Sequence, residues 1–158
     1  KLADVLRRYT EQINEAIVFA SLHGGKRVAI AKSEPVSQVI RIDQQVVESC
    51  NIYRLPTGRV LAAFATPDDY RRIQDNYGEP GVNWPDFEAD LKRIRKEGRC
   101  LMLPDSSAVN SFAVPVMNKD GKLLGAIGCY APPFRSGPSV QKKILDALRK
   151  AAEELALP

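Results

Sequence analysis

Residues 111–135, which read SFAVPVMNKDGKLLGAIGCYAPPFR, constrain the fold more than any other stretch of the chain. Two apolar runs flank the polar sequence NKDGK, where Gly121 supplies the positive φ that a tight turn needs. This pattern predicts a hairpin and therefore antiparallel pairing. The second run is unusual because it contains Gly125, Ala126, Gly128 and Ala131. Such small residues leave room beside the strand, for either a neighbouring helix or a ligand.

The rest of the chain supplies a second hairpin and several amphipathic helices. Short apolar runs on both sides of Gly24 and Gly25 predict that hairpin. The other expected strands cover residues 16–22, 27–33, 36–47 and 99–103. The expected helices cover residues 2–15, 57–65, 66–78, 84–98 and 136–156. An antiparallel sheet of about six strands with helices packed on it is an α+β domain. No repeat or linker divides residues 1–158, so we expect a single domain.

Composition and charge narrow the class of protein. The longest apolar runs fall well short of the roughly 20 residues that span a bilayer, so we expect no membrane segment. The net charge of +4 comes from 23 basic and 19 acidic residues spread along the chain. The densest basic run, residues 92–99, has helical spacing and is expected to be a solvated helix face. We therefore expect no direct DNA binding. The start has no methionine and lies on a helical pattern, so we expect a further domain upstream.

Few residues here could support catalysis, a metal site or a bound cofactor. His23 is the only histidine and lies in a turn, and no glycine-rich phosphate-binding motif is present. The carboxylate pairs in PDDY and EADL are expected at solvated helix positions. Cys50, Cys100 and Cys129 stand far apart, which favours reduced thiols in a cytoplasmic protein. A reactive thiol needs a lowered pKa, for which Arg99 beside Cys100 is a weak sign. We expect no enzyme, no metal and no cofactor; a cysteine-dependent enzyme remains an alternative.

A polar loop before the hairpin is the strongest candidate for a binding site. Residues 103–111, LPDSSAVNS, place Asp105, Asn110 and Ser111 beside a strand of small residues. Such a loop can complete an apolar pocket with a few polar anchors, and backbone amides near Gly58 could add anion-binding donors. The same pattern also fits a surface loop beside a tightly packed sheet. The residues alone leave both readings open.

Four motifs, in order, resemble the C-terminal effector-binding domain of the IclR family. The hairpin AVPVMNKDGKLLGAIGCYAPPFR is similar to the family's A-P-[VI]-[FL] strand, acidic-Gly turn and strand ending in S-G-P. LPTGRVLAAFATPDDY resembles its segment of small residues followed by Gly-Lys and a helix. DLKRIRKEGRC resembles its L-x-x-I-R-x-x-G helix end, and residues 6–34 resemble its opening helix and hairpin. The resemblance covers nearly the whole chain.

The resemblance implies a GAF-like sheet with helices on both faces and a role in bacterial transcription regulation. It implies a cytoplasmic domain that binds a small effector, such as an organic or aromatic acid, and assembles into a homo-oligomer, a dimer or tetramer. DNA would be bound only through an N-terminal winged helix-turn-helix domain that is absent from this chain. The alternative within the same lineage is a dimerisation module that binds no ligand.

The family's ligand positions transfer onto this sequence incompletely. Its small-residue loop before Gly-Lys corresponds to Pro56, Thr57 and Gly58, with Arg59 in place of lysine. Its acidic residue corresponds loosely to Asp105, and its polar position in the first hairpin strand to Ser111. Two serines of the second strand, which commonly hold a carboxylate, are replaced by Gly128 and Tyr130, so Tyr130 either lines the pocket or plugs it. The predicted ligand-binding residues are Pro56, Thr57, Gly58, Asp105, Asn110, Ser111, Gly128 and Tyr130.

Overall fold

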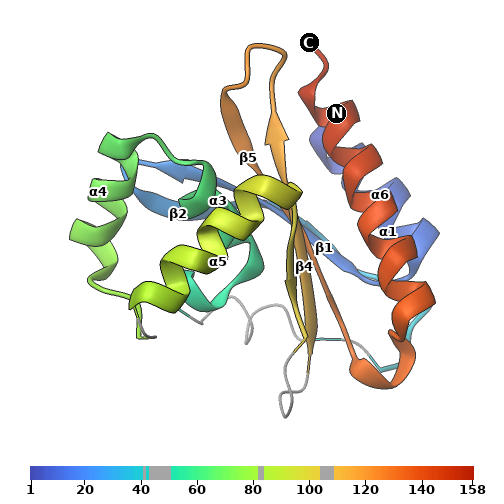
Figure 1. Cartoon of the computed structure of the whole chain (residues 1–158). Helices are drawn as coiled ribbons and strands as arrows, with labels where there is room; N and C mark the ends of the chain where they lie inside the picture. The colour runs from blue at the N-terminus through green and yellow to red at the C-terminus, as the bar shows by residue number, and fades with distance from the viewer. Residues whose placement is uncertain (41, 43–50, 82–83, 104–108) are drawn as a thin grey trace.

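Five antiparallel strands form one sheet, in the order β2–β1–β5–β4–β3 (Figure 1). The computed structural model describes the chain except residues 41, 43–50, 82–83 and 104–108. The strands are β1 (Ala16–His23), β2 (Lys26–Ser33), β3 (Cys100–Met102), β4 (Asn110–Met117) and β5 (Leu123–Ala131). The helices are α1 (Leu2–Ile13), α3 (Pro56–Phe64), α4 (Pro67–Tyr77), α5 (Trp84–Glu97) and α6 (Pro138–Ala156). The 3-10 turns η1 (Ile52–Arg54) and η2 (Pro133–Arg135) complete the order. The predicted α+β class is confirmed.

Both predicted hairpins are present. β1 pairs with β2, and β4 pairs with β5 across a turn where Gly121 has φ 78°. β1 and β5 then pair centrally, with Ala16 opposite Tyr130 and Val18 opposite Gly128. The two hairpins are far apart in the sequence, but they pair with each other inside the sheet.

The expected third strand at residues 36–47 is wrong for the residues that can be checked. Residues 36–40 and 42 lie in no strand, and 43–47 fall outside the described residues. Ser37 and Gln38 instead donate hydrogen bonds to the side-chain and main-chain oxygens of Asn14. The described sheet accordingly has five strands, whereas about six were expected.

The helix boundaries follow the capping signals. The Thr66 hydroxyl accepts a hydrogen bond from the Asp69 amide at 3.1 Å, and α4 ends at Gly78 as predicted. α5 ends at Gly98, and Phe87, Leu91 and Ile94, which recur at helical spacing, are buried. α1 ends slightly earlier than expected because Asn14 adopts the left-handed conformation at its C-terminus.

The helices cover both faces of the sheet, as predicted. α1 and α6 lie side by side on one face, whereas α3 and α5 lie on the other, with α4 beyond α3 near β2 (Figure 1). None of the helices among the described residues is both long and apolar enough to cross a bilayer.

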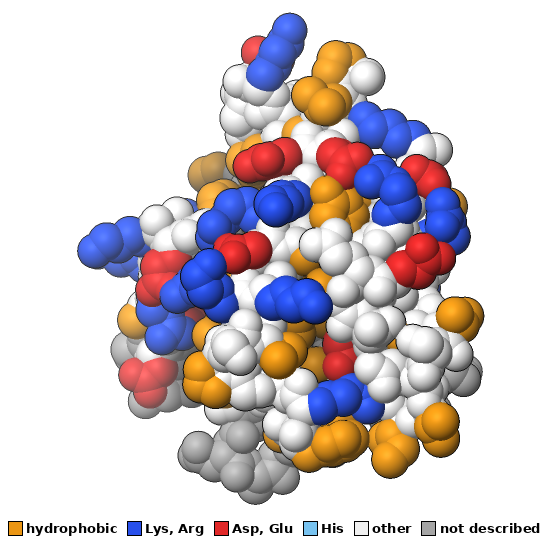
Figure 2. Space-filling model, turned by 90° about the vertical axis from the view of Figure 1, so that its right-hand side faces the viewer, with side chains coloured by type: hydrophobic (Ala, Val, Ile, Leu, Met, Phe, Trp, Pro, Cys, Tyr) orange, Lys and Arg blue, Asp and Glu red, His pale blue; other side chains and the backbone are white. Residues whose placement is uncertain are grey.

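The outer surface of the α1–α6 layer is charged but carries no patch of a single sign. Figure 2 looks onto this side and shows Lys and Arg side chains interspersed with Asp and Glu. Arg8 of α1 reaches Glu154 of α6 at 2.6 Å, and Lys142 pairs with Asp146 along α6. The densest basic run also behaves as predicted, since Lys92, Arg93, Arg95 and Lys96 are exposed.

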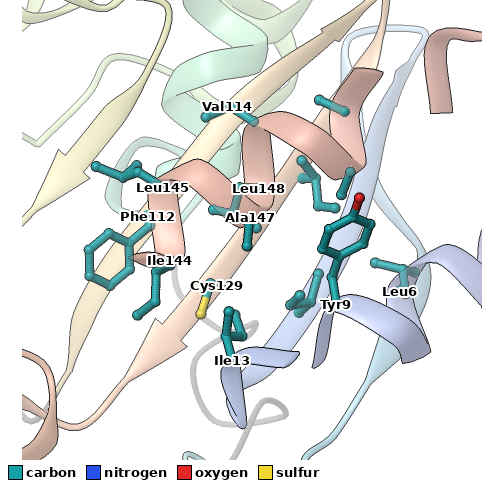
Figure 3. Close-up of a cluster of buried hydrophobic side chains, with 14 of the residues drawn as sticks. Leu6, Tyr9, Ile13, Phe112, Val114, Cys129, Ile144, Leu145, Ala147 and Leu148 are labelled. Carbon is teal, nitrogen blue, oxygen red and sulfur yellow. The ribbon is translucent and has the colours of Figure 1, made fainter. Parts of the chain in front are cut away.

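The inner surface of the same layer forms the larger apolar core. Figure 3 shows Phe112, Val114 and Cys129 of the sheet facing Ile144 and Leu148 of α6, with side chains of α1 beside them. Each of these five side chains is at most 2% exposed. One apolar stripe of α6 therefore packs on the sheet, with Val140 and Leu155 at its half-buried ends.

Candidate functional site

The beginning of α3 lies directly on the strand of small residues. A Cβ atom at Gly128 would come within 2.6 Å of the Thr57 methyl group and 3.1 Å of the Phe112 carbonyl oxygen. Thr57 is fully buried, and Ala20, Ala113 and Ala126 belong to the apolar cluster beneath α3 and α5. The room beside Gly128 is therefore occupied by a helix, which answers the choice that the sequence left open at this position.

Gly58 is required by packing. A Cβ atom there would meet the Ile52 carbonyl oxygen at 1.9 Å, far inside contact distance. The first turn of α3 can therefore lie against η1 only if this position is glycine. Pro56 opens the helix at a position where its missing N–H costs nothing, and it is buried. Residues 56–58 thus hold the helix end in place beside β5.

An arginine that the sequence analysis did not select reaches this end of α3. Arg27 of β2 donates from Nε to the Thr57 hydroxyl at 2.9 Å, and its main-chain amide donates to the Tyr77 hydroxyl at 2.8 Å. Arg27 lies opposite Leu22, and Ala29 lies opposite Ala20, so both point to the α3 face. The Arg27–Ala29 alternation in RVAIAKS was the signal that could have identified it.

Tyr130 and Ser111 extend the site along the same face. They are direct partners in the β4–β5 register, and Tyr130 follows Gly128 by two residues, so both face the α3 side. Tyr130 is 0% exposed and Ser111 is 7% exposed. At zero exposure the phenol ring touches no space large enough for a water molecule. A ligand could reach it only if neighbouring groups moved.

One of the predicted residues is not brought to this place, and another cannot be located. Asn110 precedes Ser111 and, by strand alternation, points to the opposite face, where its Nδ2 donates to the Ser136 hydroxyl at 2.9 Å. Its opposite partner Ala131 belongs to the α1–α6 core, which agrees with that orientation. Asp105 lies outside the described residues. Thr57 therefore contacts both Arg27 and Gly128, while Tyr130 and its partner Ser111 follow on the same face, two residues farther along the strands.

Nucleophilic and metal chemistry find little support among the described residues. Burial raises the pKa of Cys100 to about 12, and burial also raises the pKa of Cys129 well above its ordinary value. The thiols of these two residues are therefore neutral at physiological pH. Cys50 lies outside the described residues. In the described part of the chain, no group of three or more His, Cys, Asp or Glu side chains could hold a metal ion.

One carboxylate differs from the prediction of a solvated position. Asp90 in EADL is half-buried: its Oδ2 atom lies 2.5 Å from Nη1 of Arg59, and its other oxygen pairs with Arg93. Arg59 also donates to the Tyr53 carbonyl oxygen at 2.6 Å. This ion pair joins α3 to α5. The pair is therefore a structural contact between two helices. Arg59 occupies the position where the family pattern has lysine.

The chain belongs to a family of bacterial transcriptional regulators. The family model that describes the C-terminal part of IclR regulators matches residues 1–157. The resemblance inferred from the four motifs is thereby confirmed. The relatives are transcription regulators.

Individual relatives agree in fold. The Pca regulon regulatory protein of Pseudomonas putida is 26% identical over 158 residues, which cover 95% of this chain and 54% of that protein. An IclR transcriptional regulator from Alicyclobacillus acidocaldarius superposes with a TM-score of 0.79 at 18% identity, covering 98% of this chain and 65% of its own. The inducer-binding domain of the PobR transcription factor from Acinetobacter, solved as a double mutant with 3-hydroxybenzoic acid, gives 0.78 at 23% identity, covering 98% and 94%. This chain spans about half the length of the curated relative.

Proposed function

We propose that residues 1–158 form a single effector-binding domain that senses a small organic anion for a transcription regulator. The observation that carries the proposal is the position of the Thr57 side chain, whose hydroxyl accepts from Arg27 Nε at 2.9 Å and whose methyl group lies against Gly128, two residues before Tyr130. A guanidinium fixed beside a hydroxyl is a suitable partner for a carboxylate. A relative with the same fold was solved with an aromatic acid bound, which supports the same class of ligand here.

Tyr130 is the gate of the proposed site. In the strand register Tyr130 lies between Ala16 and Ser111, and it is 0% exposed, so an effector must displace it or enter beside it. We propose Pro56, Thr57, Gly58, Ser111 and Gly128 as the walls of the site, with Asp105 completing them. Asn110 points to the opposite face, where it donates to Ser136, so it is left out of the proposed site.

The assembly is proposed to act on DNA indirectly. Effector binding would change the geometry of a dimer or tetramer whose winged helix-turn-helix domains lie outside this chain, through different affinities for two states. The face in Figure 2 has mixed charges and no basic patch for DNA, which is in line with this proposal. The protein is proposed to work in the cytoplasm, without a cofactor.

A second function is favoured by one observation. Thr57 fills the room at Gly128, and Tyr130 is fully buried, which also fits a dimerisation module that binds no ligand. The third alternative, a cysteine-dependent enzyme, loses support because burial raises the pKa of both described thiols.

A thermal-shift screen separates the first two functions. The panel contains aliphatic, aromatic and sugar acids, including 3-hydroxybenzoate, and is run on the wild type, Tyr130→Ser and the control Tyr70→Ser on α4. A ligand at 100 times its dissociation constant should add about 2.7 kcal/mol of stability. A hit in the wild type that changes in Tyr130→Ser but not in Tyr70→Ser supports a sensor. Hits confined to Tyr130→Ser would identify a plugged site, and silence in all three would favour the dimerisation module.

A second experiment tests whether the site recognises the charge of the effector. For any acid that binds, the matched uncharged amide is measured by calorimetry on the wild type and on Arg27→Gln. The acid should bind the wild type more tightly than the amide, and Arg27→Gln should reduce that preference. An unchanged preference would remove Arg27 from the proposed site.

A further inference from the structure

A buried ion pair lies just beyond the strand ends that hold Tyr130. Glu15, between α1 and β1, is 3% exposed and accepts two hydrogen bonds from Arg135 at the end of η2. The donors are Nε at 2.7 Å and Nη2 at 2.8 Å, one to each carboxylate oxygen. A bidentate pair of this kind fixes both distance and orientation. It therefore holds the start of β1 to the segment that follows β5.

Arg135 also contacts a third segment of the chain. Its Nη1 atom donates to the Ile40 carbonyl oxygen at 2.6 Å, while its guanidinium lies 5.4 Å from the Phe134 ring centroid. The neighbouring Asn14 accepts from Ser37 at 2.9 Å and from Gln38 at 3.1 Å. The end of α1, residues 37–40 and η2 consequently meet at one polar cluster, which we call the Arg135 cluster.

The Arg135 cluster has direct connections to the proposed site and to α1. Ala16, which pairs with Tyr130, is the residue after Glu15. Ser136, which follows Arg135, accepts from Asn110 at the start of β4. On the other side, the Asn14 amide donates to the Thr10 carbonyl oxygen at 2.7 Å and closes the last turn of α1. A shift of Tyr130 and its strand partner would thus be passed to α1 across one residue.

We propose that Arg135 is a positioning residue that couples packing at Tyr130 to helix α1 through its ion pair with Glu15. The proposal rests on the proposed function in that Tyr130 is taken as the effector gate. Coupling of this kind is a free energy shared between the two places, so a change at either one affects the other. Because Glu15 and Asn14 follow directly on α1, this helix is the element whose order would respond to the effector.

The test is a double-mutant cycle that needs no ligand. Tyr130→Ser perturbs the site in three backgrounds: the wild type, Glu15→Gln/Arg135→Gln, and the control Arg59→Gln/Asp90→Asn. Both partners are neutralised together because removing one would leave an unpaired buried charge. The control removes the half-buried pair between α3 and α5. Among the described residues, the hydrogen bonds of this pair do not reach the Arg135 cluster. The readout is amide hydrogen exchange of residues 2–14.

Coupling predicts that the effects do not add. Tyr130→Ser should speed exchange in α1 by at least about threefold in the wild-type and control backgrounds, and by much less in the Glu15→Gln/Arg135→Gln background. If the ion pair is purely structural, Tyr130→Ser will speed exchange in α1 by the same factor in all three backgrounds, and this result would overturn the proposal. Exchange in α1 that does not change in any background would overturn it as well. If Tyr130→Ser does not fold in one background, Tyr130→Phe runs the same cycle. If no acid in the thermal-shift panel stabilises the protein, the proposed effector function fails. The double-mutant cycle still tests the coupling, because it needs no ligand.

Discussion

The two faces of the sheet are built from the same strands but are filled in opposite ways. Toward α1 and α6, the strands project large side chains such as Phe112, Val114 and Ile127. Toward α3, the neighbouring positions Ala113 and Gly128 are small, and the helix supplies the volume instead. Strand alternation lets one sequence specify both kinds of contact.

This difference indicates where the molecule can adapt. Rearranging the α1–α6 face would open cavities, because its volume comes from side chains fixed to the sheet. On the α3 face, the volume beside Gly128 is supplied by Thr57 of the helix, so this contact depends on where the end of α3 lies. The face of small residues is therefore the one to which we assign the proposed effector site.

The largest expected effect is a loss of stability from the α1–α6 face. Phe112→Ala should lower the free energy of unfolding by about 3–5 kcal/mol, because the ring is fully buried and leaves a cavity. Urea unfolding followed by circular dichroism measures it. Leu124→Ala on β5, which is 39% exposed, is the control and should change stability by less than about 1 kcal/mol. Similar losses in both variants would contradict the assignment of Phe112 to a tightly filled core.

The two cysteines test whether both faces are equally closed. Cys100 lies in the cluster beneath α3 and α5, and Cys129 lies in the α1–α6 core. With a pKa of about 12 for Cys100, its thiolate fraction at pH 8 is roughly a thousandfold below that of an ordinary thiol. In a Cys50→Ser background, iodoacetamide should label neither residue in the folded protein and both in urea. Rapid labelling of folded Cys100 would revive the cysteine-enzyme alternative and show that the α3 face opens.

A smaller effect tests the contact between α3 and the sheet. Gly128→Ala should cost about 1–3 kcal/mol, because the new methyl group would overlap the Thr57 methyl group. This overlap outweighs the gain of roughly 0.5–1 kcal/mol that alanine has over glycine inside a strand. Thr57→Ser removes the opposing methyl group and keeps the hydroxyl that Arg27 uses. The double variant should therefore lose less than the sum of the single losses, whereas strict additivity would place the helix end elsewhere.

Much of the fold could be predicted because the signals are local. Turn glycines and the helical spacing of apolar residues each depend on positions a few residues apart, and both hairpins and the five helices of the described residues were predicted from them. The strand expected at residues 36–47 failed because an alternating pattern cannot show that Ser37 and Gln38 bond to Asn14. That contact joins segments more than twenty residues apart.

The site could be predicted only in part, for the same reason. Thr57 and Gly128 were selected, but their direct contact depends on how α3 lies on the sheet. Arg27 was missed because its partner lies 30 positions away. Asn110 and Ser111 were treated as one cluster, although adjacent strand residues point to opposite faces.

The smallest expected effect lies on the outside of the α1–α6 layer. Hydrogen bonds from Arg8, and then from Tyr9, lower the pKa of the Glu154 carboxyl below its ordinary value. A lowered folded-state pKa means that this contribution to stability is present above the unfolded-state pKa and is lost as the pH falls through the folded-state value. An NMR titration should place the Glu154 midpoint below about 4.3, and Arg8→Gln should raise it. Because the Arg8 and Glu154 side chains keep 43% and 34% of their surface exposed to solvent, the accompanying loss of thermal stability should be slight and should weaken further with salt. Equal midpoints in the wild type and Arg8→Gln would show that the two helices are held together by their apolar faces alone.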